Sequence, residues 1–144
     1  MSVDSFLDTN VLVYAATCDE ANKAKRNCAL ELIDTENFSL SAQVLQEFYV
    51  TVTRKLEVRL TSEQAQQWLE QFEVFPCVSV DSSLVKRGIQ ISVRYQTSYW
   101  DGAIIAAAEN IGATRLYSED LNHGQKYENI TVMNPFATLQ RCSA

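Results

Sequence analysis

Short runs of β-branched and aromatic residues alternate along this chain with longer segments in which apolar residues recur every three or four positions. Such alternation is typical of a parallel sheet covered by helices on both faces. Strands are expected at residues 3–7, 38–40, 77–80, 114–117 and 130–133. At 144 residues, the chain has the size of one domain. We therefore predict a single α/β domain, residues 1–144, with a central parallel sheet of about five strands flanked by helices.

Helices are expected where a residue that can cap a helix stands before a segment of helical periodicity. The capping positions are Asp19, Ser41, Thr61, Asp81 or Ser82, and Ser98. Segment 48–53 is β-branched and aromatic, so by itself it is also compatible with a strand. A four-residue spacing of apolar residues favours a helix instead, at Val44, Phe48, Val52 and Leu56. The same spacing defines the expected inner face of the helix after Asp81, with Val85, Ile89 and Val93.

The chain is acidic, with 18 Asp and Glu residues against 12 Lys and Arg, a net charge of −6 and a pI of about 4.7. A protein that coats nucleic acid is usually basic, so this class is disfavoured. A nuclease remains compatible with the charge, because several of the acids can gather in a site where a metal neutralises them. An acidic surface also suits a basic partner protein.

The cysteines are Cys18, Cys28, Cys77 and Cys142, and no two of them have Cys-x-x-Cys spacing. Because the chain has a single histidine, His123, a Cys/His zinc site is not expected. We expect buried free thiols in a reducing compartment. No apolar run is long enough to span a membrane, and residues 1–4 lack the features of a secretory signal. These features predict a cytoplasmic protein with no membrane attachment.

Four acidic residues from four separate segments are expected at one edge of the sheet. They are Asp8, Glu47, Asp101 and Asp120. Each directly follows a predicted strand or lies early in a helix, and ligands of parallel sheets bind outside the carboxyl ends of the strands. Mg²⁺ and Mn²⁺ prefer oxygen ligands and can activate both a phosphodiester and the attacking water. The set therefore predicts a Mg²⁺ or Mn²⁺ site for phosphodiester hydrolysis.

Taken singly, each acid also has a simpler interpretation. Asp101 stands three residues after Ser98, where an acid can complete a capping box. Asp8 can begin a turn, and Glu47 can be a solvated residue beside the apolar stripe of its helix. The evidence for a shared site is the order and context of the four acids along the chain. The chain contains no G-x-S-x-G, P-loop or G-x-G-x-x-G motif, so serine hydrolases and the common nucleotide-binding folds are not supported.

Four segments of the chain, in order, resemble the motifs of PIN domains. Segment 6–12, Phe-Leu-Asp-Thr-Asn-Val-Leu, is similar to the opening of the family, and segment 41–49 is similar to its second motif. Segment 99–102, Tyr-Trp-Asp-Gly, resembles the third. Segment 116–121 resembles the fourth, in which a Ser or Thr stands two residues before the acid. The resemblance covers residues 4 to about 135.

This resemblance implies a five-stranded parallel sheet and a metal-dependent endoribonuclease site. Its catalytic and metal-binding acids are implied to be Asp8, Glu47, Asp101 and Asp120. Asn10 and Ser118 match positions that orient ligands or water. Glu119 is the weaker candidate, because the Ser-x-acid spacing selects Asp120. Gly102 departs mildly from the family, in which Ala or a larger residue is frequent there, and it is expected to loosen the helix start.

The small size of the chain resembles that of toxin components of VapBC-type toxin–antitoxin modules. Such toxins are inhibited by a partner antitoxin and are commonly dimeric, so the implied partners are RNA, a cognate antitoxin and a second copy of the chain. Arg54 and Lys55, which follow Glu47 by two turns on the same predicted helix, are candidates for phosphate contact. Two alternatives remain open. One is a catalytically silent PIN-like interaction module, and the other is a HAD-like phosphatase, which needs an Asp where this chain has Asn10.

Overall fold

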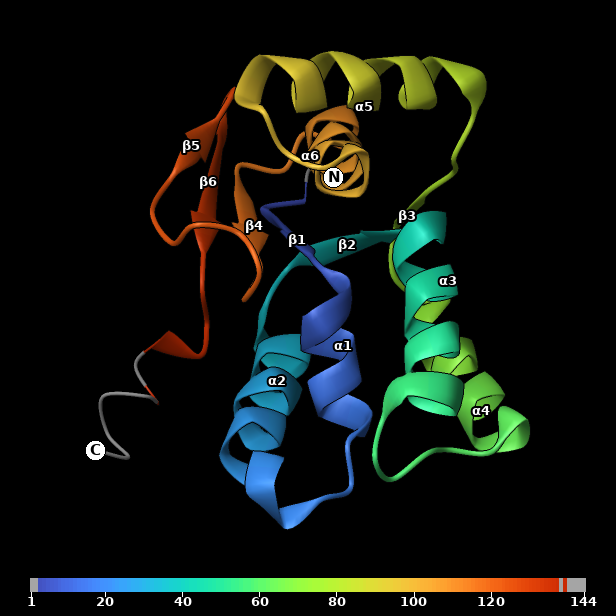
Figure 1. The fold of residues 1–144 in the computed structure, drawn as a ribbon. Coiled ribbons are helices and arrows are strands. Elements are labelled where there is room, and N and C mark those ends of the chain that lie inside the picture. The colour runs from blue at the N-terminus through green and yellow to red at the C-terminus, as the bar shows by residue number, and fades with distance from the viewer. Residues whose placement is uncertain (1–2, 138, 140–144) are drawn as a thin grey trace.

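The structure is a computed structural model that describes residues 3–137 and 139. Its sheet has the strand order β3-β2-β1-β4-β6-β5 (Figure 1). The strands are β1 Ser5–Leu7, β2 Phe38–Ser41, β3 Cys77–Val78, β4 Arg115–Tyr117, β5 Lys126–Tyr127 and β6 Ile130–Met133. Every neighbouring pair is parallel except β5 and β6, which form an antiparallel hairpin. The predicted α/β fold with a mainly parallel sheet is confirmed, and the sixth strand, β5, is an addition.

Strand β1 lies inside the sheet and sets its register. Ser5 is aligned with Phe38 of β2 on one side and with Arg115 of β4 on the other. All three residues of β1 are buried, as expected for a strand covered on both faces. At the far end Leu7 is aligned with Tyr117, so the residues that follow these two strands emerge side by side.

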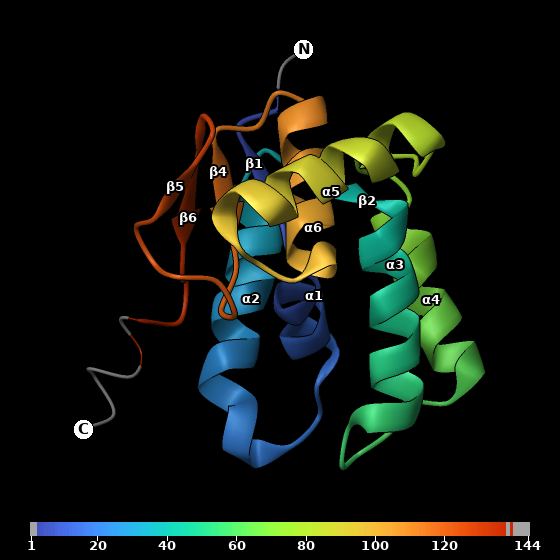
Figure 2. The ribbon, with the colours of Figure 1, turned by 45° about the horizontal axis from the view of Figure 1, so that its top comes forward.

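Within the described residues, six α-helices accompany the sheet. They are α1 Thr9–Ala16, α2 Lys23–Thr35, α3 Ala42–Val50, α4 Ser62–Phe72, α5 Ser82–Tyr95 and α6 Tyr99–Asn110. Helices α5 and α6 lie together on one side of the sheet, and α1 to α4 lie toward the other side (Figures 1 and 2). A short 3₁₀ turn, Glu20–Asn22, precedes α2, and a π-helical turn, Thr51–Lys55, extends α3.

The predicted capping residues stand at the helix starts. The side chains of Ser41, Asp81 and Ser98 accept backbone N–H groups in the first turns of α3, α5 and α6. Thr61 forms a full capping box with Gln64 at the start of α4. Asp19 caps the 3₁₀ turn that leads into α2. These side chains satisfy N–H groups that have no partner within the helix.

The strand alternative for segment 48–53 is wrong. The segment continues α3 into the π-helical turn, and the apolar side chains of Val44, Phe48 and Val52 are fully buried. Burial of one stripe thus outweighs the local β preference of these residues.

Helix α1 was not expected. Its sequence, Thr-Asn-Val-Leu-Val-Tyr-Ala-Ala, is apolar almost throughout, and five of its eight residues are buried. A helix covered on most sides carries little amphipathic periodicity, so its sequence does not distinguish it from a strand. Its start is nevertheless marked, because Asp8 is its N-cap and accepts the N–H of Thr9 at 2.7 Å.

The expected inner face of α5 is wrong. Val85, Ile89 and Val93 are 36%, 48% and 73% exposed, whereas the buried face carries Leu84, Gly88 and Ile91. Gly88 gives no hydrophobic signal in the sequence, although it lies at the centre of the buried face.

Gly88 faces Gly102 where α5 crosses α6. A Cβ atom on Gly102 would lie 2.6 Å from the carbonyl oxygen of Gly88 and 2.8 Å from the Cβ of Ser92. Gly102 therefore does not loosen the start of α6 as expected. It allows the two backbones to approach closely and fixes the first turn of α6 against α5.

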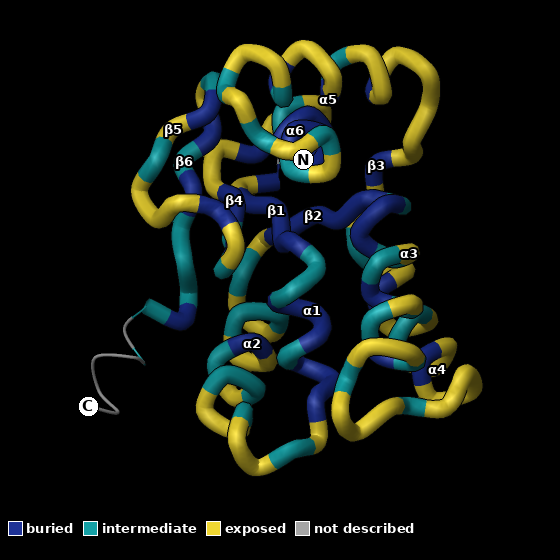
Figure 3. The backbone as a smooth tube through the Cα atoms, in the orientation of Figure 1, coloured by how far each residue is buried: buried dark blue, intermediate teal, exposed yellow. Residues whose placement is uncertain are grey.

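The core gathers around the sheet and the inner faces of the helices, where the chain is buried in a continuous region (Figure 3). The prediction of buried thiols is wrong for the cysteines in the described part of the chain. Cys18 and Cys77 are exposed and Cys28 is half-buried, although all three are free thiols. Cys142 lies outside the described residues. No helix within residues 3–137 is long and apolar enough to cross a membrane.

Candidate functional site

A groove of about 750 Å³ opens beside the carboxyl ends of the central strands. Its walls come from α1, α3, the π-helical turn, the first turn of α6 and the loop after β4. Among the acids expected at the site, Glu47 and Asp120 line this groove, and so does Glu119.

Asp8 and Ser118 are brought together by the register of the sheet. They follow the paired residues Leu7 and Tyr117, and the backbone N–H of Asp8 donates to the carbonyl of Tyr117 at 3.0 Å. The Ser118 hydroxyl donates to Asp8 Oδ2 at 2.8 Å, while the Thr9 N–H donates to Asp8 Oδ1. Both oxygens of Asp8 are therefore held in place by donors.

Ser118 also fixes the loop that follows β4. Its hydroxyl oxygen accepts the backbone N–H of Asp120 at 3.2 Å and that of Leu121 at 3.4 Å. One buried hydroxyl thus connects the carboxylate of Asp8 with the main chain that carries Asp120.

Asp8 is the most perturbed of the four acids. It is 5% exposed, and its pKa is raised from 3.8 to about 7. Burial is the main cause, and the charges of Asp120 and Glu47 add to it, while the hydrogen bonds from Ser118 and Thr9 act in the opposite direction. A carboxyl group held in this way is costly to ionise without a neighbouring cation.

Glu47 is held on α3 by two side chains. The Thr9 hydroxyl donates to Oε2 at 2.7 Å, and the side-chain amide of Gln43 donates to Oε1 at 2.9 Å. Gln43 stands four residues before Glu47, so both lie on one face of the helix. The contact with Thr9 joins α3 to the start of α1.

Asp101 lies in the first turn of α6, where the Ser98 hydroxyl accepts its backbone N–H at 3.1 Å. Partial burial raises the pKa of Asp101, the hydrogen bond with Ser98 opposes the shift, and the charges of Asp120 and Glu47 add to it. Asp120 and Glu47 thus act electrostatically on both Asp8 and Asp101. Asp8 and Asp101 are thus each near two of the other predicted acids, although neither is among the residues that line the groove.

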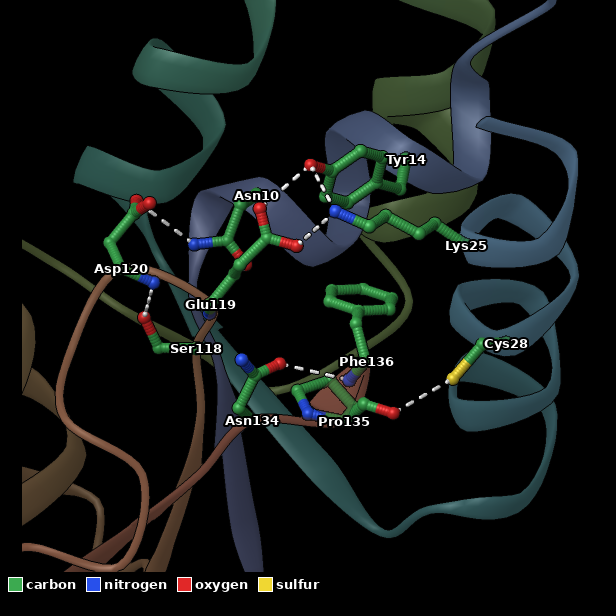
Figure 4. Close-up of polar contacts among 10 residues, drawn as sticks. All are labelled: Asn10, Tyr14, Lys25, Cys28, Ser118, Glu119, Asp120, Asn134, Pro135 and Phe136. Carbon is green, nitrogen blue, oxygen red and sulfur yellow. Dashed lines mark hydrogen bonds and ion pairs between the residues drawn. The ribbon is translucent and has the colours of Figure 1, made fainter. Parts of the chain in front are cut away.

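Asn10 holds the loop that carries Asp120 (Figure 4). Its side-chain amide donates to Asp120 Oδ2 at 3.1 Å, and its Oδ1 accepts the backbone N–H of Glu119 at 3.2 Å. An Asp at position 10 would have no amide hydrogen to donate to Asp120. The geometry therefore gives Asn10 a specific role and does not suit the HAD-like alternative.

Glu119 is directed toward α2 and away from Asp120 (Figure 4). Lys25 Nζ forms an ion pair with its Oε2 at 2.8 Å, and the Tyr14 hydroxyl donates to its Oε1 at 2.8 Å. Lys25 Nζ also lies 4.9 Å from the centre of the Tyr14 ring and 5.8 Å from that of Phe136. Burial lowers the pKa of Lys25, but the contacts with Glu119 and Tyr14 raise it overall, so Lys25 stays charged.

The two basic candidates differ in position. Lys55 lines the groove, whereas Arg54 is not among its lining residues, and both are exposed on the π-helical turn. Only Lys55 is therefore placed to meet a phosphate in the groove.

The donor set suits a hard divalent cation. Carboxylate, hydroxyl and amide oxygens are the ligands that Mg²⁺ and Mn²⁺ prefer. Within the described ranges no three His, Cys, Asp or Glu side chains are close enough to enclose one ion. Mg²⁺ usually binds through one or two carboxylates and completes its shell with water and substrate oxygens. The four acids fit that arrangement better than they fit an all-protein cage.

Three supporting residues were missed by the sequence analysis: Thr9, Gln43 and Lys25. The position of Gln43, one helical turn before Glu47, is a signal that could have found it. Thr9 and Lys25 act across elements far apart in the chain, and no local pattern marks such contacts.

The fold and site define a class of protein: a parallel α/β domain with clustered carboxylates beside a groove at the carboxyl edge of its sheet. A family model for the PIN domain matches residues 5–129. The chain belongs to the PIN-domain family. A comparison with curated protein sequences finds no significant match.

Solved structures with the same fold include components of toxin–antitoxin pairs. Mycobacterium tuberculosis VapC20, described as a sarcin–ricin loop cleaving toxin, is 19% identical over 81% of this chain and 90% of its own, with a TM-score of 0.65. A chain of a toxin–antitoxin complex from Klebsiella pneumoniae is 15% identical over 92% of this chain and 98% of its own, with a TM-score of 0.69. A chain of VapBC2 from Rickettsia felis, solved with a promoter DNA fragment, is 18% identical, covering 90% and 97% with a TM-score of 0.61. These likenesses establish the shared fold.

Proposed function

We propose that this PIN domain is a Mg²⁺- or Mn²⁺-dependent endoribonuclease that hydrolyses RNA phosphodiester bonds. The observation that carries the proposal is the gathering of acids from four segments: Glu47 and Asp120 line one groove, and their charges act on both Asp8 and Asp101. Repulsion among these carboxylates is unfavourable by itself and is relieved when a cation binds. The family membership and the fold shared with an RNA-cleaving toxin support the same function.

The proposed roles follow from the contacts of each side chain. One or two of the carboxylates of Asp8, Glu47, Asp101 and Asp120 would hold the cation, and water and substrate oxygens would complete its shell. Ser118 and Asn10 orient Asp8 and Asp120 through the hydrogen bonds at 2.8 Å and 3.1 Å. A bound divalent cation supplies Lewis-acid activation of the phosphodiester and of the attacking water.

The test is cleavage of a panel of structured and unstructured RNAs by the purified chain, with Mn²⁺ and with EDTA. We expect cleavage with Mn²⁺ and none with EDTA. Asp8→Asn should lower cleavage by orders of magnitude, whereas Glu63→Gln, in the first turn of α4, should leave it unchanged. Full cleavage in EDTA would exclude the metal mechanism. A folded chain that cuts no RNA under any condition would favour the silent interaction module.

We further propose that a cognate antitoxin blocks this groove by inserting a basic side chain among the carboxylates. Support comes from the net charge of −6 and from the toxin–antitoxin complexes that share the fold. Arginine suits the insertion because its planar guanidinium pairs with a carboxylate through two hydrogen bonds. Purification of the tagged chain from its native host should recover a small partner. A chain that expresses freely without harm and recovers none would contradict the proposal.

A homodimer is the third part of the proposal. The exposed stripe on α5, formed by Val85, Ile89 and Val93, is an apolar helix face that one protomer leaves open to solvent. In analytical ultracentrifugation the parent chain should sediment as a dimer and Ile89→Arg as a monomer. Val74→Arg, at a residue that is 78% exposed outside the stripe, is the matched control. Equal sedimentation of parent and Ile89→Arg would exclude this face as the interface.

A further inference from the structure

Trp100 is a large apolar side chain left open to solvent beside the acids. It is 63% exposed, stands directly before Asp101 and lines the same groove as Glu47 and Asp120. Exposed apolar residues are common on protein surfaces, but an exposed indole in a groove is a frequent mark of ligand contact. None of the roles proposed above uses it.

The main chain at Trp100 is fixed relative to the site. The side-chain amide of Gln43 donates to the carbonyl oxygen of Trp100 at 3.2 Å and to Glu47 Oε1 at 2.9 Å. The indole ring packs edge-to-face on Tyr99, with ring centres 5.1 Å apart. The first turn of α6 is held further by the close crossing at Gly102. One amide thus couples the backbone that carries the indole to a proposed catalytic acid.

The charge of the groove makes such a surface useful to an RNA nuclease. Of the described residues that line it, only Lys55 is basic, against Glu47, Glu119 and Asp120. Contacts between basic residues and phosphates, which supply most of the affinity of ordinary nucleic-acid-binding proteins, are therefore scarce here. Stacking of a base on an aromatic side chain contributes to binding and needs no positive charge.

We propose that Trp100 is a stacking platform for an unpaired nucleobase next to the scissile phosphodiester. This rests on the proposed ribonuclease function. A base within a duplex has both faces covered by its neighbours, so only an unpaired base can lie on the indole. The exposed side-chain amide of Gln46, which lines the same groove, can bond a base edge, whereas Gln43 already donates to Glu47 and Trp100.

The chain allows a direct optical test, because it contains two tryptophans, Trp68 and Trp100. In an Asp8→Asn, Trp68→Phe protein, Trp100 is the sole tryptophan and the RNA is not consumed. We expect a ten-nucleotide single-stranded RNA to quench its fluorescence saturably and the blunt duplex of the same sequence to leave it unchanged. In the same protein, Trp100→Ala should weaken binding of the single strand about tenfold, and Trp100→Phe should retain most of it. Because these two variants contain no tryptophan, their binding is measured by the anisotropy of an end-labelled RNA.

Salt dependence gives an independent measurement. Each phosphate neutralised on a single strand contributes a slope of about −0.7 to log K against log salt. With Lys55 as the basic residue of the groove, the single-strand slope should be shallower than about −2. A steeper slope would show that binding depends on phosphate contacts elsewhere, and it would overturn the stacking proposal.

The remaining outcomes separate the two proposals. Cleavage of RNA by the parent, without quenching and with equal activity of Trp100→Ala, overturns the stacking role and leaves the nuclease intact. Quenching by single-stranded RNA in a chain that cuts none supports the platform and overturns the nuclease. Quenching by a co-purified partner protein but not by RNA assigns Trp100 to the partner and overturns the proposal. Thermal melts of the Trp100 variants establish that each is folded.

Discussion

Asp8→Asn should stabilise the metal-free protein at neutral and alkaline pH, although it removes a residue proposed to be essential for cleavage. Burial and the neighbouring acids raise the pKa of Asp8 from 3.8 to about 7. Between these pH values the folded chain keeps a proton on Asp8 that the unfolded chain has released. The stability linked to this proton is fully present below the unfolded pKa and is lost as the pH rises through about 7.

The magnitude follows from this shift. At about 1.4 kcal/mol per pKa unit, the rise corresponds to about 4 kcal/mol of folding free energy lost above pH 7. Asparagine carries no charge and caps a helix about as well as aspartate, but it weakens the 2.8 Å hydrogen bond from Ser118. If that bond contributes about 1 kcal/mol, the net gain at pH 8 is about 3 kcal/mol, or roughly 9 °C in Tm. At pH 4.5 the destabilisation caused by the raised pKa of Asp8 is about 1 kcal/mol. The weakened hydrogen bond from Ser118 costs about the same, so Asp8→Asn should leave the stability unchanged.

The assay is a thermal melt of parent and Asp8→Asn in EDTA at pH 4.5 and pH 8, beside RNA cleavage with Mn²⁺. Glu63→Gln removes a carboxylate on an exposed helix start and should give no pH-dependent gain. An equal change of Tm at both pH values would show that a buried charge at Asp8 is not the cause. An unchanged Tm at pH 8 together with full cleavage would refute the carboxylate cluster itself.

Four further substitutions test neighbouring features by the same melts and cleavage assay. Lys25→Met removes the ion pair with Glu119, which contributes about 1 kcal/mol, so Tm should fall by roughly 3 °C. Adding Glu119→Gln should recover most of the lost Tm, because no unpaired carboxylate then remains. Gly102→Ala places a Cβ 2.6 Å from a carbonyl oxygen of α5 and should cost about 1–3 kcal/mol; an unchanged Tm would mean that the helices separate without penalty. Asp101→Asn should raise the metal-free Tm at pH 8 by less than Asp8→Asn, because the pKa of Asp101 is raised by partial burial but its charge also favours the start of α6. A larger gain for Asp101 than for Asp8 would contradict the burial argument.

The sequence was informative where a local pattern has one physical cause. Ser41 and Ser98 have side chains that bond free backbone N–H groups, and they correctly marked the starts of α3 and α6. The order of strands and helices was sufficient for the parallel sheet. The segments that carry Asp8 and Asp120 could be placed at one edge, because parallel strands end on the same side.

The errors arise where contacts between elements decide the outcome. The prediction of the inner face of α5 was wrong because Gly88, at the centre of that face, has no apolar side chain. The absence of a side chain allows the close approach to Gly102. Strand β5 has only two residues, and the turn after it uses Glu128 at φ 54°, where Gly or Asn would be the usual sign of a hairpin. The pairing of Lys25 with Glu119 joins positions far apart in the chain. No pattern within one segment contains that information.

The two-residue strands at both ends of the sheet, β3 and β5, limit how this protein can be recognised. Pairing of main chains across an edge, the way many domains capture peptides, needs several consecutive free N–H and C=O groups. A strand of two residues offers too few of them for a lasting register. The short edges therefore leave the side chains of helices and loops as the surfaces that a partner can read. Such surfaces can change their partner through single substitutions without disturbing the sheet, so close relatives of this chain can diverge in partner choice while keeping the same fold.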